Sequence, residues 1–141
     1  MRRTASMVAV LTALAMIAGC RNDSQTGPTA AVAGTYQMKT MNGASLPYSI
    51  AAGSLTLQVT RDVLVLNADG SYVDSTTYQI PGANGASQIS TSIERGTYKY
   101  SSNGSITFVD ATAGGSTYRG SIAGTTLTES VNGATPVYER Q

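Results

Sequence analysis

The segment from Gly96 to Asp110 constrains the fold more than any other part of the chain. In its sequence, GTYKYSSNGSITFVD, two tyrosines and then Ile106 and Phe108 alternate with polar residues. A period of two places successive side chains on opposite faces of a strand, so each arm predicts a strand with one buried face. Asn103-Gly104 lies between the arms and tolerates the positive φ of a tight turn. The segment therefore predicts a β-hairpin.

Variations on this pattern follow one another through the rest of the chain. Glycine-containing pairs that favour turns separate them: Asn42-Gly43, Asp69-Gly70, Gly114-Gly115, Ala123-Gly124 and Asn132-Gly133. Besides the two arms of the hairpin, strands are expected over residues 34–40, 55–60, 63–66, 72–80, 89–93, 117–122, 125–130 and 136–140. Leu46-Pro47-Tyr48 is a weak element, because a proline cannot donate to a sheet and belongs at an edge.

The expected fold is all-β, an antiparallel meander of about eight to ten short strands with no internal helix. Connections this short force neighbouring strands to pair antiparallel. A twisted meander with one apolar face tends to close, because closure removes exposed strand edges. A small up-and-down β-barrel is therefore the first prediction, and an open β-sandwich of two layers is the alternative.

Composition narrows the classes of protein that fit this chain. Its 141 residues suggest one domain, and 12% charged residues with 15 glycines suit short strands joined by turns. Without Arg2 and Arg3, which belong to the leader described below, 9 − 2 = 7 basic residues face 8 acidic ones. This balance leaves no basic patch for nucleic acid. The single cysteine excludes an internal disulfide.

The N-terminus has the plan of a secretory signal peptide. Arg2 and Arg3 form a positive start, and the apolar run 8–18 is too short to span a membrane. The run ends in Ile17-Ala18-Gly19-Cys20, which resembles the lipobox of bacterial lipoproteins at all four positions. The resemblance implies cleavage between Gly19 and Cys20 and acylation of the Cys20 thiol. An ordinary signal peptide with a chance cysteine is the alternative.

These features divide the chain into a signal peptide (1–19), a lipidated Cys20 with a flexible tether (20–32), and a β-barrel domain (33–141). The tether assignment rests on the lack of periodicity from Arg21 to Val32. Aspartate after the lipidated cysteine is associated with retention in the inner membrane. Because Arg21 stands there, we expect a lipid anchor in the outer membrane, facing the periplasm or the surface.

The start of the domain resembles the lipocalins. Gly34-Thr35-Tyr36 looks like the Gly-x-Trp that opens their first strand, with tyrosine in place of tryptophan. Arg140, near the end of the chain, matches the arginine that packs across that aromatic ring. The resemblance covers about residues 33–140. It implies a lipocalin-like barrel that carries a small hydrophobic ligand in its interior.

Eight tyrosines against one phenylalanine make an unusual aromatic set. Their rings are interpreted as core, or alternatively as the lining of a cavity. Asp74 shares strand parity with Tyr72, and Glu129 shares parity with Leu127, so both acids point inward unless a bulge reverses the parity or they lie at the barrel mouth. The candidate ligand-lining residues are Tyr72, Asp74, Tyr78, Tyr98, Tyr100 and Glu129.

No catalytic residue is predicted, since the chain lacks histidine and its many serines and threonines single none out. A metal site is not expected either, although a calcium site made only of carboxylates stays open. No motif for a cofactor is present, and the Asn-Gly and Gly-Gly pairs are turns rather than phosphate loops. The expected function is a non-catalytic binding or structural role at the cell envelope. A carrier of a small hydrophobic ligand is the alternative, an enzyme or inhibitor ranks last, and the sequence indicates no particular protein partner.

Overall fold

The computed structural model describes residues 28–82 and 85–141. The signal peptide, the lipobox with Cys20 and the tether up to residue 27 lie outside the described residues. Within them the structure has one short helix, α1 (Pro28–Val32). The strands are β1 (Gly34–Met41), β2 (Ala44–Ser45), β3 (Tyr48–Ala52), β4 (Leu55–Leu66), β5 (Ser71–Pro81), β6 (Ser87–Tyr100), β7 (Ser105–Asp110), β8 (Ser116–Ala123), β9 (Thr126–Ser130) and β10 (Pro136–Arg140).

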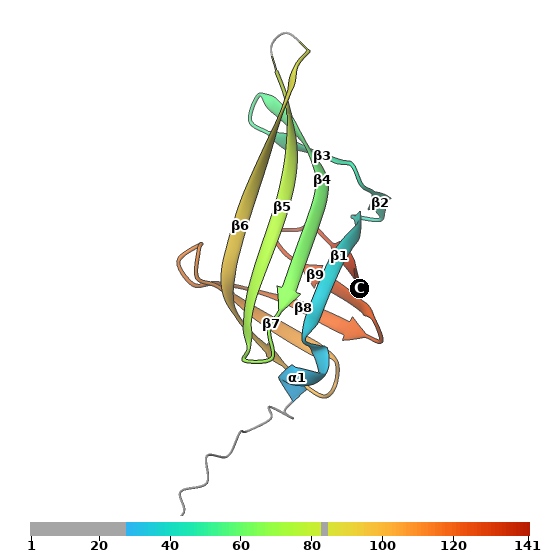
Figure 1. Cartoon of the computed structure of the whole chain (residues 1–141), viewed down its shortest axis with the longest axis vertical. Coiled ribbons are helices and arrows are strands. Elements are labelled where there is room, and N and C mark those ends of the chain that lie inside the picture. Colours follow the sequence, from blue (N-terminus) through green and yellow to red (C-terminus); the bar gives the residue numbers. More distant parts are fainter. Residues whose placement is uncertain (1–27, 83–84) are drawn as a thin grey trace, which may run out of the picture.

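Eight of these strands close into an antiparallel barrel, so the predicted fold class is confirmed (Figure 1). Strands β4 to β10 each pair with the next in the sequence, and β1 joins the two ends of this run. It pairs with β10 on one side and with β4 on the other. This closure excludes the open sandwich.

Two short strands interrupt the meander between β1 and β4. Strand β2 pairs only with the end of β1, and β3 pairs only with the start of β4. The chain thus leaves the barrel after β1 and returns through β3. Residues 55–66, expected as two strands, form the single strand β4, with an irregularity in the pairing between Val59 and Arg61. A β-bulge of this kind keeps a strand continuous while it shifts the side-chain parity.

The last five residues of the segment expected as a tether form helix α1 in the structure. Helix α1 lies at the lower end of the barrel in Figure 1, and Val32 is buried there. The Tyr36 hydroxyl donates to the Val32 carbonyl at 2.8 Å, and the Tyr98 hydroxyl donates to the Thr29 carbonyl at 3.2 Å. The Arg140 guanidinium donates to the carbonyls of Ala31 and Ala33. Contacts with distant residues thus hold a segment whose own sequence has no helical pattern.

The barrel interior is apolar at the end near α1. The buried side chains there include Tyr36, Leu66, Tyr98, Ile106, Ile122 and Leu127, and above them lie Leu64, Tyr72, Phe108 and Tyr138. Phe108 is central to the upper group, since Tyr72 meets its ring edge-on with centroids 5.2 Å apart. Bulky side chains therefore fill this part of the barrel as a packed core.

Candidate functional site

Five strands place a carboxyl group on the inward-facing stripe of the barrel, farther from α1 than the apolar core. On each strand, the inward side chains between the acid and the end near α1 are mostly apolar. Examples are Leu66-x-Leu64-x-Asp62 on β4, read from its C-terminal end, and Ile106-x-Phe108-x-Asp110 on β7. We call this set the acidic layer: Asp62, Asp74, Glu94, Asp110 and Glu129. It contains five of the eight acidic residues of the chain.

Asp62 and Asp74 are neighbours in the acidic layer. Asp62 is 3% exposed, and it follows the bulge that turns β4 inward. Thr76 donates to its Oδ2 at 3.1 Å, while Oδ1 of each aspartate has no hydrogen-bond partner among the described residues. Burial, together with the neighbouring Asp62 carboxyl group, raises the pKa of Asp74 to about 9. Burial also raises the pKa of Asp62. The pair therefore holds a proton at neutral pH.

Glu94 lies next to this pair and receives two tyrosine hydroxyls. Tyr118 donates to Oε1 at 2.9 Å, and Tyr72 donates to the same oxygen. The Tyr118 ring also stacks on Phe108, with centroids 4.8 Å apart and planes at 12°. Burial raises the pKa of both tyrosines, so their hydroxyls stay protonated donors. The two tyrosines thus join the acidic layer to the aromatic core below it.

Glu129 is the acid that β9 contributes to the layer. It is 4% exposed, and its Oε1 has no hydrogen-bond partner within the described part of the chain. Burial raises its pKa well above the usual value, and the charges of Asp74 and Glu94 add to this effect. Glu129 lines a shallow pocket of about 310 Å³ together with Gly120. Its unpaired oxygen is itself buried, so Glu129 is a costly inner acid of the layer.

Asp110 has a structural role instead. Its Oδ1 accepts hydrogen bonds from the backbone N–H groups of Thr112 and Ala113, at 2.7 and 3.0 Å. These bonds fix the loop between β7 and β8. The loop forms part of the wall of the pocket described next, so Asp110 shapes the site.

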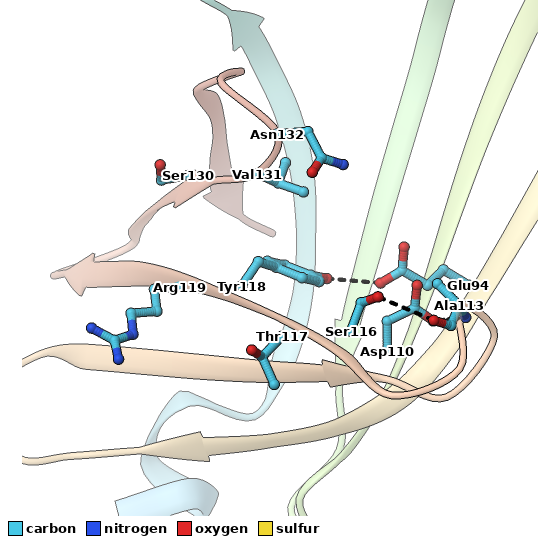
Figure 2. A pocket seen from close by; sticks show the side chains of 10 residues that line it. All are labelled: Glu94, Asp110, Ala113, Ser116, Thr117, Tyr118, Arg119, Ser130, Val131 and Asn132. Atoms are coloured by element: carbon cyan, nitrogen blue, oxygen red, sulfur yellow. Dashed lines mark hydrogen bonds between the residues drawn. The ribbon is translucent and has the colours of Figure 1, made fainter.

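A pocket of about 440 Å³ opens beside the acidic layer. Glu94, Asp110 and Tyr118 line it, together with Ala113, Ser116, Thr117, Arg119, Ser130, Val131 and Asn132. Figure 2 shows the Tyr118 hydroxyl and the Glu94 carboxyl facing each other across it, while the Arg119 guanidinium points away from both. Its volume suits a small organic molecule.

The basic residues of the described chain do not contact the acidic layer, and the guanidinium of Arg119, which lines the pocket, points away from Glu94. Lys39, Arg61, Arg95, Lys99, Arg119 and Arg140 are all exposed. Within residues 28–82 and 85–141, the hydrogen bonds to the acidic layer come from hydroxyl and backbone groups. The acids therefore face inward without a protein cation to balance them.

The candidate residues named from the sequence fall into two groups. Tyr72 and Tyr98 are buried in the core, and Tyr100 packs against it. The Tyr98 hydroxyl also donates to the Asn67 carbonyl at 2.7 Å, which leaves the ring little freedom. Tyr78, Asp74 and Glu129 lie in or above the acidic layer, with Tyr78 half-buried. Asp74 and Glu129 both point inward. The alternative that a β-bulge reverses their parity therefore does not apply to their strands.

Sequence reasoning missed Asp62, Glu94, Tyr118 and Tyr138. Strand parity could have found the last three: Glu94 shares the parity of Tyr98, Tyr118 that of Ile122, and Tyr138 that of Pro136. Asp62 was overlooked because the strand was expected to begin at the next residue.

No group of three or more His, Cys, Asp or Glu among the described residues is arranged to hold a metal ion. In the same part of the chain, no helix has the length and hydropathy needed to cross a membrane. No protein-family model matches the chain, and no curated protein matches it.

Proposed function

We propose that the protein is a lipid-anchored, non-catalytic binding barrel of the bacterial cell envelope, and that it takes a small organic cation at the acidic layer. One observation carries the proposal. Five carboxyl groups face the interior beside an open pocket, and none of them bonds to a cation of the described chain, since the guanidinium of Arg119 at the pocket points away from Glu94. Uncompensated buried carboxyl groups are costly, so a ligand that supplies positive charge gains what the protein lacks.

The chemistry around the pocket favours an aromatic amine of the arylalkylamine kind. Tyr118 offers a ring face and a hydroxyl, and Glu94 beside it offers a carboxylate. An ammonium group binds well where a carboxylate and an aromatic ring meet. The described acids of the layer do not form a group that could hold a metal ion, so a larger organic cation fits the arrangement better.

The packed lower barrel argues against the alternative, a carrier of hydrophobic molecules. Tyr36, Leu66, Tyr98 and Leu127 occupy the space that such a ligand needs. The open space lies instead at the acidic layer, among polar groups. A purely structural role remains the competing proposal, and binding measurements distinguish the two.

The envelope location rests on the N-terminal sequence. The lipobox-like Ile17-Ala18-Gly19-Cys20 supports acylation of Cys20, and Arg21 supports anchoring in the outer membrane. Acyl transfer needs the thiol, so we expect Cys20→Ala to leave the precursor unprocessed. Detergent phase partitioning tests this. We expect wild-type protein in the detergent phase, and we expect the mutant either to be excluded from that phase or to keep its leader and therefore be longer. Wild-type protein wholly in the aqueous phase would refute the anchor.

Calorimetry on the full-length protein in detergent tests the ligand class. Phenethylamine is compared with phenylethanol and phenylacetate, which share its ring but are neutral and anionic. We expect binding of the amine alone, with an affinity that rises as the pH approaches about 9 and the carboxyl groups of the layer release their protons. Equal binding of the alcohol, or no heat with any amine, would refute an organic-cation site.

A matched pair of variants locates the site. Glu94→Gln removes a carboxylate from the pocket and keeps its shape, so we expect amine affinity to fall at least about tenfold, in line with a lost charged hydrogen bond. Glu139→Gln removes a carboxylate that bonds instead to the hydroxyls of Thr125 and Thr126. It should leave the affinity unchanged.

A further inference from the structure

Strand β6 has a long free edge above the barrel rim. It pairs with β5 from Ser87 to Thr97, but with β7 only from Gly96 to Tyr100. The last backbone bond on the β7 side goes from the Ala111 N–H to the Arg95 carbonyl, at 2.9 Å. Figure 1 shows β5 and β6 rising together past the ends of β7 and β8. Residues 87–93, the free edge, therefore have a neighbouring strand on one side only.

The alternation of backbone groups shows which residues of the free edge are open to a partner. The Tyr98 N–H donates to the Gly70 carbonyl at 2.7 Å, so even-numbered residues of β6 bond toward β5. The bond to the Arg95 carbonyl shows that odd-numbered residues bond to the other side. By the same alternation, the N–H and C=O groups of Ile89, Thr91 and Ile93 point away from β5.

The sequence of the free edge does nothing to discourage pairing. Ser-Gln-Ile-Ser-Thr-Ser-Ile, residues 87–93, contains no charge and no proline, the usual guards of an exposed edge. Ile89 is 78% exposed and Ile93 is 43% exposed, and they share the outer face of the sheet. An uncharged, isoleucine-bearing edge of this length is typical of a strand that pairs with another.

We propose that two copies of this protein associate through their free edges, which pair antiparallel about a two-fold axis at Thr91. In this register Ile89 of one copy lies opposite Ile93 of the other, and the same pair forms again across the axis. The open backbone groups also match, because residues 89, 91 and 93 then form three hydrogen-bonded pairs, or about six bonds. Pairing ends where the loop between β7 and β8 bonds to Arg95.

A second copy is the occupant that the edge itself specifies. The register that centres on Thr91 satisfies the open backbone groups and places each exposed isoleucine opposite another. A strand from a different protein would have to supply apolar residues opposite Ile89 and Ile93. The dimer joins two barrels along one continuous sheet and leaves the pocket at Glu94 on the inner face, so it does not depend on the proposed ligand.

Sedimentation equilibrium of the full chain in the Cys20→Ala background, which removes the native thiol, tests the proposal. We expect a dimer. Thr91→Pro deletes an N–H that points away from β5, so it should give a monomer with an unchanged melting temperature. Thr91→Ala keeps that N–H and should stay dimeric. A monomeric parent protein at high concentration, or a Thr91→Pro variant that still dimerises, would overturn the proposal.

Oxidative cross-linking tests the register. In an antiparallel hydrogen-bonded pair the two Cα atoms at the axis lie about 5.5 Å apart, within reach of a disulfide. Thr91→Cys should therefore give a cross-linked dimer. Thr97→Cys, on the same face of β6 but beside β7, should remain uncross-linked under the same conditions. Equal cross-linking of both variants would mean random collision and would contradict the two-fold pairing.

Discussion

Tyr118 donates its hydroxyl to Oε1 of Glu94 at 2.9 Å, from a strand that is separated from Glu94 by the whole width of β7. The hydroxyl of Tyr72 reaches the same oxygen from the other side. Glu94 is thus held at the boundary where the aromatic core gives way to the acidic layer. This boundary divides the barrel into a half that is packed for stability and a half that is polar and bordered by open space.

Removing the Tyr118 hydroxyl should weaken this boundary without unfolding the barrel. Tyr118→Phe keeps the ring stacked on Phe108 and leaves Glu94 one donor fewer. We expect a loss of about 1–2 kcal/mol in the free energy of unfolding, measured by urea denaturation. Tyr48→Phe is the control, since that hydroxyl accepts an exposed hydrogen bond from Asn42. Equal effects of the two changes would show that the bond to Glu94 adds nothing.

The acidic layer should make the protein less stable as the pH rises. The pKa of Asp74 is raised from 3.8 to about 9, so the folded protein keeps a proton that the unfolded chain has lost. The folded state then binds more protons, and stability declines between about pH 4 and about pH 9. Burial raises the pKa values of Asp62 and Glu129 as well, in the same direction. Thermal melts across this range should show a falling melting temperature.

The variant Asp74→Asn tests the origin of this decline. An amide cannot ionise, so the melting temperature should fall less steeply with pH and should exceed the wild-type value above about pH 8. Asp69→Asn is the control, because Asp69 is exposed and its bonds to Ser71 lower its pKa instead. A wild-type melting temperature that does not change across the range would mean that the inner carboxyl groups are solvated.

Local pattern predicted much of this fold, because short antiparallel strands carry their own signals. The parity of Tyr98 and Ile106 placed the inner face, and Asn42-Gly43 marked a turn in which both residues have positive φ. Three features depend on contacts between distant residues and could not be predicted in this way. They are the pairing of β1 with β4, the bulge that turns Asp62 inward, and helix α1 at the lower end.

The candidate site was only half visible in the sequence for a related reason. Parity pointed Asp74 and Glu129 inward, but it said nothing of which strands would bring their carboxyl groups close together. That proximity follows from barrel closure, which places Asp62, Asp74, Glu94 and Glu129 of four strands around one interior. The tyrosines were ambiguous because the same side chain serves as core at Tyr98 and as pocket wall at Tyr118.

A side chain should destabilise the protein more at Gly104 than at Gly115, which has nearly the same φ. Gly104 has φ +89°, and an added Cβ would lie 2.9 Å from the Ile122 carbonyl oxygen. Gly115 has φ +88° with nothing within 4 Å of such a Cβ. Both alanine variants bear the cost of positive φ, about 1–2 kcal/mol. Gly104→Ala should lose at least about 1 kcal/mol more in urea denaturation, because backbone must shift. Equal losses would contradict the close approach.

Arg140 should anchor helix α1 to the barrel. Its guanidinium donates to the carbonyls of Ala31 and Ala33, so Arg140→Ala removes two of the side-chain bonds that hold the helix. The bonds from Tyr36 and Tyr98 remain. We therefore expect local loosening, with a loss of about 1 kcal/mol in global stability, since the bonds are exposed. Hydrogen exchange should show faster exchange of the amides between Thr29 and Val32, while β7 and β8 keep their protection. Lys99→Ala removes an exposed charge from β6 and serves as the control. Unchanged exchange at α1 in the Arg140 variant would mean that Val32 and the two tyrosines hold the helix by themselves.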